Sequence, residues 1–149
     1  MKSNFLFILL AFFIGFMPPV QGALNSLLNQ YLKHPLQATF INFTFGVLVL
    51  VVLLLAFNIS FPSIQVLKQT PWYLMIGGAM GVIFVSSIIV LIPKIGATNL
   101  LAAAIVGQLV MSVIIDHKGW LKVPVHEINI YRVVGVVLLI AGIFLVQKT

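Results

Sequence analysis

Three amide side chains at four-residue steps are the first residues in this chain whose spacing could serve chemistry. Gln21, Asn25 and Asn29 form one stripe if the segment is helical, because residues four apart share a helix face. Pro18 and Pro19 lie one turn before the stripe, and proline removes a backbone donor and kinks a helix. A kinked helix beside a stripe of amides predicts a substrate pathway at membrane depth. The alternative is that the amides bridge helices, which contributes about 0.6 to 2 kcal/mol each.

A second stripe of the same spacing occurs late in the chain. Gln108, Ser112 and Asp116 follow one another at four-residue steps. An unpaired polar group in lipid costs several kcal/mol, so these side chains also need partners. We expect Gln108 and Ser112 to line the same pathway as the first stripe. Asn42, in another apolar run, is expected to join it, because only a short turn separates that run from the first stripe.

Asp116 is one of two acidic residues in the chain, the other being Glu127. An acid inside a membrane segment is a functional candidate by default. Here it lies at the edge of an apolar run, at the end of a helix where the dipole favours cations rather than anions. Two roles stay open, namely proton coupling and an interfacial ion pair with Lys118 or Arg132.

Composition excludes several classes of function. The chain has no cysteine, and His34, His117 and His126 lack the spacing of metal ligands. No nucleophile with a base and no acid pair is recognisable, so we expect no enzyme, no metal site and no cofactor. Eight basic residues give a formal charge of +6 but are scattered, whereas a nucleic-acid site needs a basic patch. Nucleic acid is therefore not an expected partner.

The elements that must position these residues are membrane helices. Hydrophobic residues make up 62% of the chain and charged residues 7%, against about 25% charged in soluble domains. A helix needs about 20 apolar residues to cross the hydrocarbon layer, and only helices satisfy their own backbone bonds there. We therefore predict an all-α fold, one transmembrane domain over residues 1–149. Its five spans are predicted at 5–32, 36–57, 72–92, 97–115 and 130–146.

The first apolar run allows a different interpretation. Lys2 followed by the run 5–16 resembles a signal peptide, with Gly22 near a cleavage site. Cleavage would leave four spans. The helical pattern continues past Gly22 through Leu24 and Leu27, which favours an uncleaved first helix.

Orientation is weakly specified by the cations at the span ends. Five spans place the termini on opposite sides, with five cations on the N-terminal side and three on the other. Because cations favour the cytoplasm, this bias slightly favours a cytoplasmic N-terminus, but we expect both orientations. Two oppositely inserted copies would form an inverted repeat, the frame of many secondary transporters. We predict an antiparallel homodimer, or a pair with a homologous chain; a parallel dimer and a monomer are the alternatives.

Glycines at helical spacing are expected to let helices approach closely. The last predicted span carries no polar residue except near its start, which suits dimer packing or lipid contact. The glycines assigned to packing are Gly77, Gly81, Gly107, Gly135 and Gly142.

The segment 108–120, QLVMSVIIDHKGW, resembles the hallmark of the YdcZ-like family of the drug/metabolite transporter superfamily. Segments 21–29, 93–97 and 132–135 are similar to that family as well. The resemblance covers nearly the whole chain. It implies five-helix half-transporters of the inner membrane that act as antiparallel pairs or as fused ten-helix proteins, most of them exporters.

The small multidrug resistance proteins, which are similar relatives with four helices, rely on a glutamate in the first helix. No acid is present in the first helix here, so amides suit a neutral, polar or zwitterionic substrate at least as well as a cationic drug. The sequence thus predicts a secondary transporter that exports a small polar molecule or metabolite by alternating access as a dimer. The alternative is a non-transporting assembly or anchor subunit.

Overall fold

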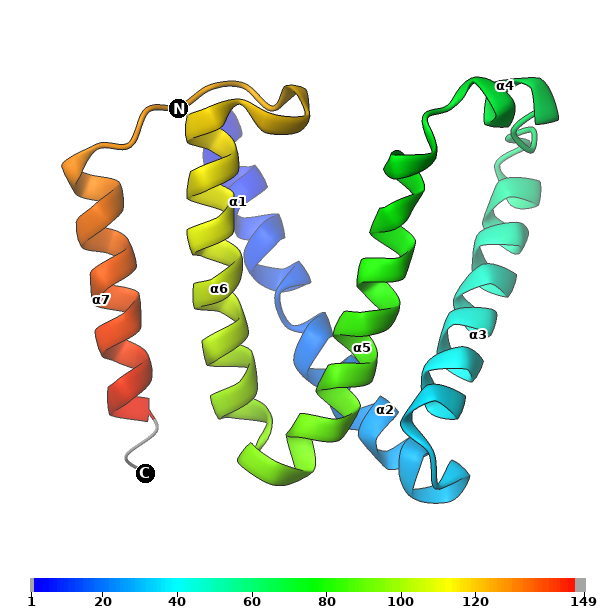
Figure 1. Ribbon diagram of the computed structural model, residues 1–149, viewed down its shortest axis with the longest axis horizontal. Helices are drawn as coiled ribbons and strands as arrows, with labels where there is room; N and C mark the ends of the chain where they lie inside the picture. The colour runs from blue at the N-terminus through cyan, green and yellow to red at the C-terminus, as the bar shows by residue number, and fades with distance from the viewer. Residues whose placement is uncertain (1, 147–149) are drawn as a thin grey trace. The chain divides into compact units, whose positions relative to one another are not determined.

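Helices are the only regular elements in the part of the chain that the structure describes. The computed structural model describes residues 2–146, with side chains for residues 5–145. The all-α prediction is therefore confirmed. The elements in chain order (Figure 1) are α1 Lys2–Ile14, α2 Met17–Leu32, α3 Pro35–Ala56, α4 Ile64–Gln69, η1 Trp72–Met75, α5 Ile76–Ile95, α6 Ala97–Lys118, η2 Trp120–Lys122 and α7 Ile130–Val146.

Four helical stretches are long and apolar enough to cross a membrane. They are Phe5–Leu32, Pro35–Ala56, Trp72–Ile95 and Ala97–Lys118. The fifth predicted span corresponds to α7, which has 17 residues and is about 26 Å long at 1.5 Å per residue. That length is slightly less than the roughly 30 Å of a hydrocarbon core. The count of five spans stays a prediction.

The chain divides into two compact units, one reaching to Lys94 and the other beginning at Ile95. The predicted single domain over residues 1–149 stays a prediction. The first contains α1 to α5, and the second contains α6, η2 and α7.

The first unit is built on the hairpin of α2 and α3. Lys33 adopts the left-handed conformation with φ of 64° and its N–H bonds the carbonyl of Asn29, which ends α2. The next residue, His34, caps α3 because its Nδ1 accepts from the N–H of Leu36 at 3.2 Å. Pro35 follows at the first helical position, where its missing N–H costs nothing. This local chemistry reverses the chain within two residues, so α2 and α3 run antiparallel (Figure 1).

The core of the first unit is small and joins three helices. Ala38 of α3 and Ile89 of α5 are fully buried, and Val85 is nearly so. Partly buried apolar side chains from α2 and α3 pack around them, including Leu28 and Phe43. Large apolar residues elsewhere are mostly exposed, as expected of helices whose outer surface faces lipid.

Two helix boundaries differ from the sequence prediction. The third span was expected to end before Pro93, but α5 continues through Pro93 to Ile95. A proline this close to a helix end interrupts little, and the turn is made instead by Gly96, whose φ of +79° favours glycine. The fourth span was expected to end near Ile115, but α6 continues to Lys118. Gly119 ends it in the left-handed conformation and bonds the carbonyl of Ile115.

In the second unit, α6 and α7 lie side by side (Figure 1). The segment between them turns back on the end of α6, because the N–H of His126 bonds the carbonyl of Asp116 at 3.0 Å. Gly119 is held closely by this segment, since a Cβ there would lie 2.7 Å from Cγ2 of Val125. The start of α7 is fixed by Asn129, whose Oδ1 accepts from the N–H of Arg132 at 3.0 Å.

Candidate functional site

The first predicted span is not one continuous helix. Gly15 and Phe16 form a turn between α1 and α2, where the N–H of Phe16 bonds the carbonyl of Phe13 at 3.1 Å. The turn lies just before Pro18 and Pro19, which occupy the first turn of α2, where proline is tolerated. The helix is therefore interrupted two to three residues before Pro18. A new helix, α2, begins at Met17 and carries the amide stripe.

Aromatic rings gather at this break. Phe12 and Phe16 stack edge to face with centroids 5.0 Å apart, and Phe13 and Phe16 do so at 5.7 Å. Such pairs add about 0.5 to 1.5 kcal/mol beyond burial. The rings thus stabilise the bend and form an apolar wall at the start of α2.

A groove of about 470 Å³ opens beside this wall. Gln21 and Asn25 reach it from α2, and Asn42 reaches it from α3. Phe13 and Phe16 are among its apolar lining residues. Three of the predicted pathway residues therefore share one groove at a helix break, within a single unit of the chain.

A second groove of about 480 Å³ shares Gln21 and Asn42 with the first. Val85 of α5 is part of its lining. Gln21 and Asn42 thus line both grooves, so the two grooves meet at these amides.

Burial differs along the stripe. Asn25 is 5% exposed, whereas Gln21 is exposed and Asn42 and Asn29 are half-buried. The Oδ1 atom of Asn29 is buried without a hydrogen-bond partner among the described residues. An unsatisfied buried acceptor costs about 1 to 3 kcal/mol, so Asn29 has unused capacity to bind water, a ligand or another chain.

The second predicted stripe lies in the other unit. Gln108 and Ser112 are exposed on α6. A cavity shared between these residues and the Asn25 groove, which lies in the first unit, stays a prediction. Asp116 is partly buried and accepts a hydrogen bond from Arg132 Nη1 at its Oδ2, 3.3 Å away. Of the two cations considered as its partner, Arg132 is the one in contact.

The glycines assigned to packing behave differently from one another. A Cβ on Gly81 would lie 3.4 Å from the ring of Phe43, so α5 approaches α3 there. Among the described residues, nothing lies within 4 Å of a Cβ built on the other four, which are Gly77, Gly107, Gly135 and Gly142. Within one chain these four leave open space, and their role in packing stays a prediction.

Two contacts were missed by reasoning from the sequence. Thr39 Oγ1 and Ser86 Oγ lie 2.9 Å apart and bond α3 to α5, whereas the neighbouring Ser87 bonds the carbonyl of Ile83 within its own helix. Gly22 is buried where α2 meets α5, and a Cβ there would lie 2.9 Å from Cδ1 of Ile92. Spacing could have identified Gly22, because Gly22 and Ser26 are small residues four positions apart, a spacing that lets membrane helices approach closely.

The chemistry available at the groove is hydrogen bonding without charge. The chain has no acidic residue before Asp116, and no charged residue lines either groove. Each amide offers two donors and one acceptor oxygen. Among residues 2–146 no cluster of three metal-ligating side chains occurs. The groove can therefore hold and orient a polar molecule.

Comparison with known proteins identifies the family of the chain. The sequence matches the family described as "Putative inner membrane exporter, YdcZ" over residues 6–145. A search of curated proteins and a search of solved structures each found no significant match. The match covers nearly the whole chain, and four of its helical stretches can span a membrane. The chain is thus a multi-pass inner-membrane protein, and it belongs to the YdcZ-like family of the drug/metabolite transporter superfamily.

Proposed function

We propose that this protein is a secondary transporter that exports a small polar molecule, and that the groove at the α1–α2 break is part of its substrate site. The observation that carries the proposal is the meeting of Gln21, Asn25 and Asn42 in one groove beside a broken helix. Broken helices supply polar sites near the midplane of secondary transporters. Membership of an exporter family supports the same direction of transport.

The lining favours a neutral or zwitterionic substrate. Amides both donate and accept hydrogen bonds, so they can pair with hydroxyl, amide or carboxamide groups. A permanent cation would find no acid in the first 94 residues to offset its desolvation. The aromatic wall at Phe13 and Phe16 offers an apolar surface to the rest of the molecule.

We further propose that transport occurs by alternating access in an antiparallel dimer, formed by two copies or with a homologous chain. The small charge bias between the two sides supports insertion in both orientations. The exposed positions of Gln108 and Ser112 on α6 leave these side chains available to a pathway that a second chain completes. In such a pair, the two inverted halves would rock around the site.

Water access to the groove tests the site without knowledge of the substrate. The chain contains no cysteine, so single cysteines report their own surroundings. Asn42→Cys lies in the groove, whereas Leu48→Cys, near the middle of the same helix, is 57% exposed and lines neither groove. A water-filled pathway makes Asn42→Cys react with a membrane-impermeant maleimide and leaves Leu48→Cys unreactive. Equal protection of both positions would rule out an open pathway here.

Transport itself is tested with purified protein in liposomes loaded with a mixture of neutral and zwitterionic metabolites, whose efflux is followed by mass spectrometry. Asn25→Ala should reduce efflux of the transported compound about fivefold, because one hydrogen bond to a ligand contributes about 1 kcal/mol. Gln30→Ala is the matched control, since Gln30 is an exposed amide on the same helix but off the stripe.

The alternative of a non-transporting assembly subunit predicts a different result. In that case the amides would only hold helices together, and Asn25→Ala would dissociate the dimer. Crosslinking and size-exclusion chromatography in detergent separate the two outcomes. An intact dimer with lost efflux supports transport, whereas dissociation supports the assembly role.

A further inference from the structure

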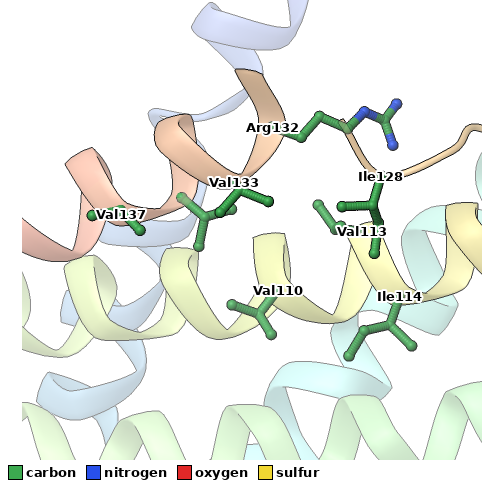
Figure 2. Close-up of a pocket in the computed structure, with 8 residues that line it drawn as sticks. Val110, Val113, Ile114, Ile128, Arg132, Val133 and Val137 are labelled. Carbon is green, nitrogen blue, oxygen red and sulfur yellow. The ribbon is translucent and has the colours of Figure 1, made fainter. Parts of the chain in front are cut away.

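A narrow apolar groove runs between α6 and α7 in the second unit (Figure 2). Val110 and Val113 face it from α6, and Val133 and Val137 face it from α7. Its volume is about 200 Å³ and its walls are almost entirely hydrocarbon. The amides of the proposed substrate site do not line it, so it is a separate feature of the chain.

Arg132 stands at one end of this groove. Figure 2 shows its side chain extending past Ile128, away from the valines. The guanidinium carries five donors. Within the described residues the Arg132 side chain makes one hydrogen bond, the 3.3 Å contact of Nη1 with Asp116 Oδ2. Its side chain remains 31% exposed, so most of its donors are available to a further anion.

The chain segment that ends at Arg132 carries a small excess of positive charge, which is the charge of Arg132 itself. Between residues 116 and 132 the chain carries three cations, Lys118, Lys122 and Arg132, against two acids, Asp116 and Glu127, which leaves a formal excess of one positive charge. This end of α6 also lies on the more basic side of the predicted topology, the side that favours the cytoplasm.

We propose that the groove binds one acyl chain of an anionic phospholipid, with the lipid phosphate on Arg132. Basic pockets between membrane helices recognise anionic headgroups in this way, and Arg pairs with phosphate through several donors at once. The apolar wall gives a free phosphate ion nothing to bind. One turn of a helix, about 10 Å across and 5.4 Å tall, occupies about 400 Å³, which exceeds the groove volume of about 200 Å³. An acyl chain is thinner than a helix and matches the hydrocarbon lining of the groove.

The first test is native mass spectrometry of the detergent-purified protein, titrated with phosphatidylglycerol or phosphatidylcholine of identical acyl chains. Wild-type protein should retain phosphatidylglycerol in preference. Arg132→Gln should weaken that retention about tenfold, because a charge-assisted hydrogen bond is lost. Lys94→Gln is the matched control. It removes one cation near the end of α5, outside the groove, and should leave retention unchanged.

Two further variants keep the proposal testable if Arg132→Gln does not fold. Val133→Phe fills the groove without changing charge and should abolish retention. Asp116→Asn removes the competing anion and should strengthen retention, which a purely structural ion pair would not do. Equal retention of the two lipids by wild-type protein would overturn the proposal, as would unchanged binding in both groove and charge variants. Competition by inorganic phosphate at millimolar concentration would instead identify a site for the free anion, and would equally overturn the lipid assignment.

Discussion

Thr39 and Ser86 form a single hydroxyl–hydroxyl contact of 2.9 Å that links α3 to α5. Thr39 is 2% exposed, so neither water nor lipid can replace its partner. Interhelical hydrogen bonds of this kind are worth about 0.6 to 1.7 kcal/mol in membranes. We expect Thr39→Val to lower the free energy of unfolding by that amount, measured by denaturant titration in detergent micelles.

A double-mutant cycle separates the bond from the effect of each substitution alone. Combining Thr39→Val with Ser86→Ala should cost no more than the larger single effect, because both changes remove the same bond. Ser87→Ala is the matched control. Its hydroxyl bonds the carbonyl of Ile83 within the same helix, so its loss should cost less than about 0.5 kcal/mol. Additive effects of Thr39 and Ser86 would contradict the contact.

At the scale of elements, Gly22 sets how closely α2 approaches α5. A Cβ at this position would meet Cδ1 of Ile92 at 2.9 Å and Cγ2 of Ile88 at 3.1 Å. Gly22→Ala should be nearly neutral, because the end of the Ile92 side chain can rotate and alanine gains about 1 kcal/mol of helix propensity. Gly22→Leu should lower the unfolding free energy by about 1 to 3 kcal/mol through overpacking.

Ala23→Leu is the control for this pair, because Ala23 is exposed on the same helix and should tolerate the larger side chain. Circular dichroism melts in detergent give the comparison. Equal stability of the Gly22→Leu and Ala23→Leu proteins would mean that α2 does not pack on α5 at Gly22. Gly22→Leu should also change the two grooves that Asn42 lines, since residues of α2 line both of them.

At the scale of the whole molecule, orientation depends on a bias of five cations to three. A single cysteine between α3 and α5 reports it by labelling from outside intact cells. Ser63 is unsuited to this, because its hydroxyl caps α4 by accepting from the N–H of Val66, so Gln65→Cys is used. We expect labelled and protected pools of similar size, since the charge difference is small.

Removing cations from the side that carries three should leave one predominant orientation in the membrane. With Lys33→Gln and Lys94→Gln added, the bias becomes five to one, and Gln65→Cys should become protected from the external reagent in most molecules. Lys33→Arg with Lys94→Arg is the charge-preserving control and should keep both pools. A single orientation in the parent protein would contradict self-sufficient antiparallel pairing and would require an oppositely inserted partner chain.

The extent to which the sequence predicted the site can be judged from particular residues. The four-residue spacing placed Gln21 and Asn25 on one helix face, because a shared face follows from helix geometry alone, and both side chains line one groove. Their meeting with Asn42 in one groove depended on the turn at Lys33 and His34, which a short gap suggested. The Thr39–Ser86 bond could not be predicted, since the two residues are 47 positions apart and the sequence carries no signal of register between α3 and α5.

The sequence by itself determined the helical fold and the membrane environment, because a chain with 7% charged residues cannot cover a water-facing surface, and backbone groups in lipid must bond within helices. Only the tertiary structure decided where the first helix breaks, which cation pairs with Asp116, and which glycines are crowded within one chain. Each of these depends on contacts between side chains on different turns or helices, such as Gly22 against Ile92 and Asp116 against Arg132. Periodicity along one segment fixes a face of a helix, whereas packing fixes what that face meets.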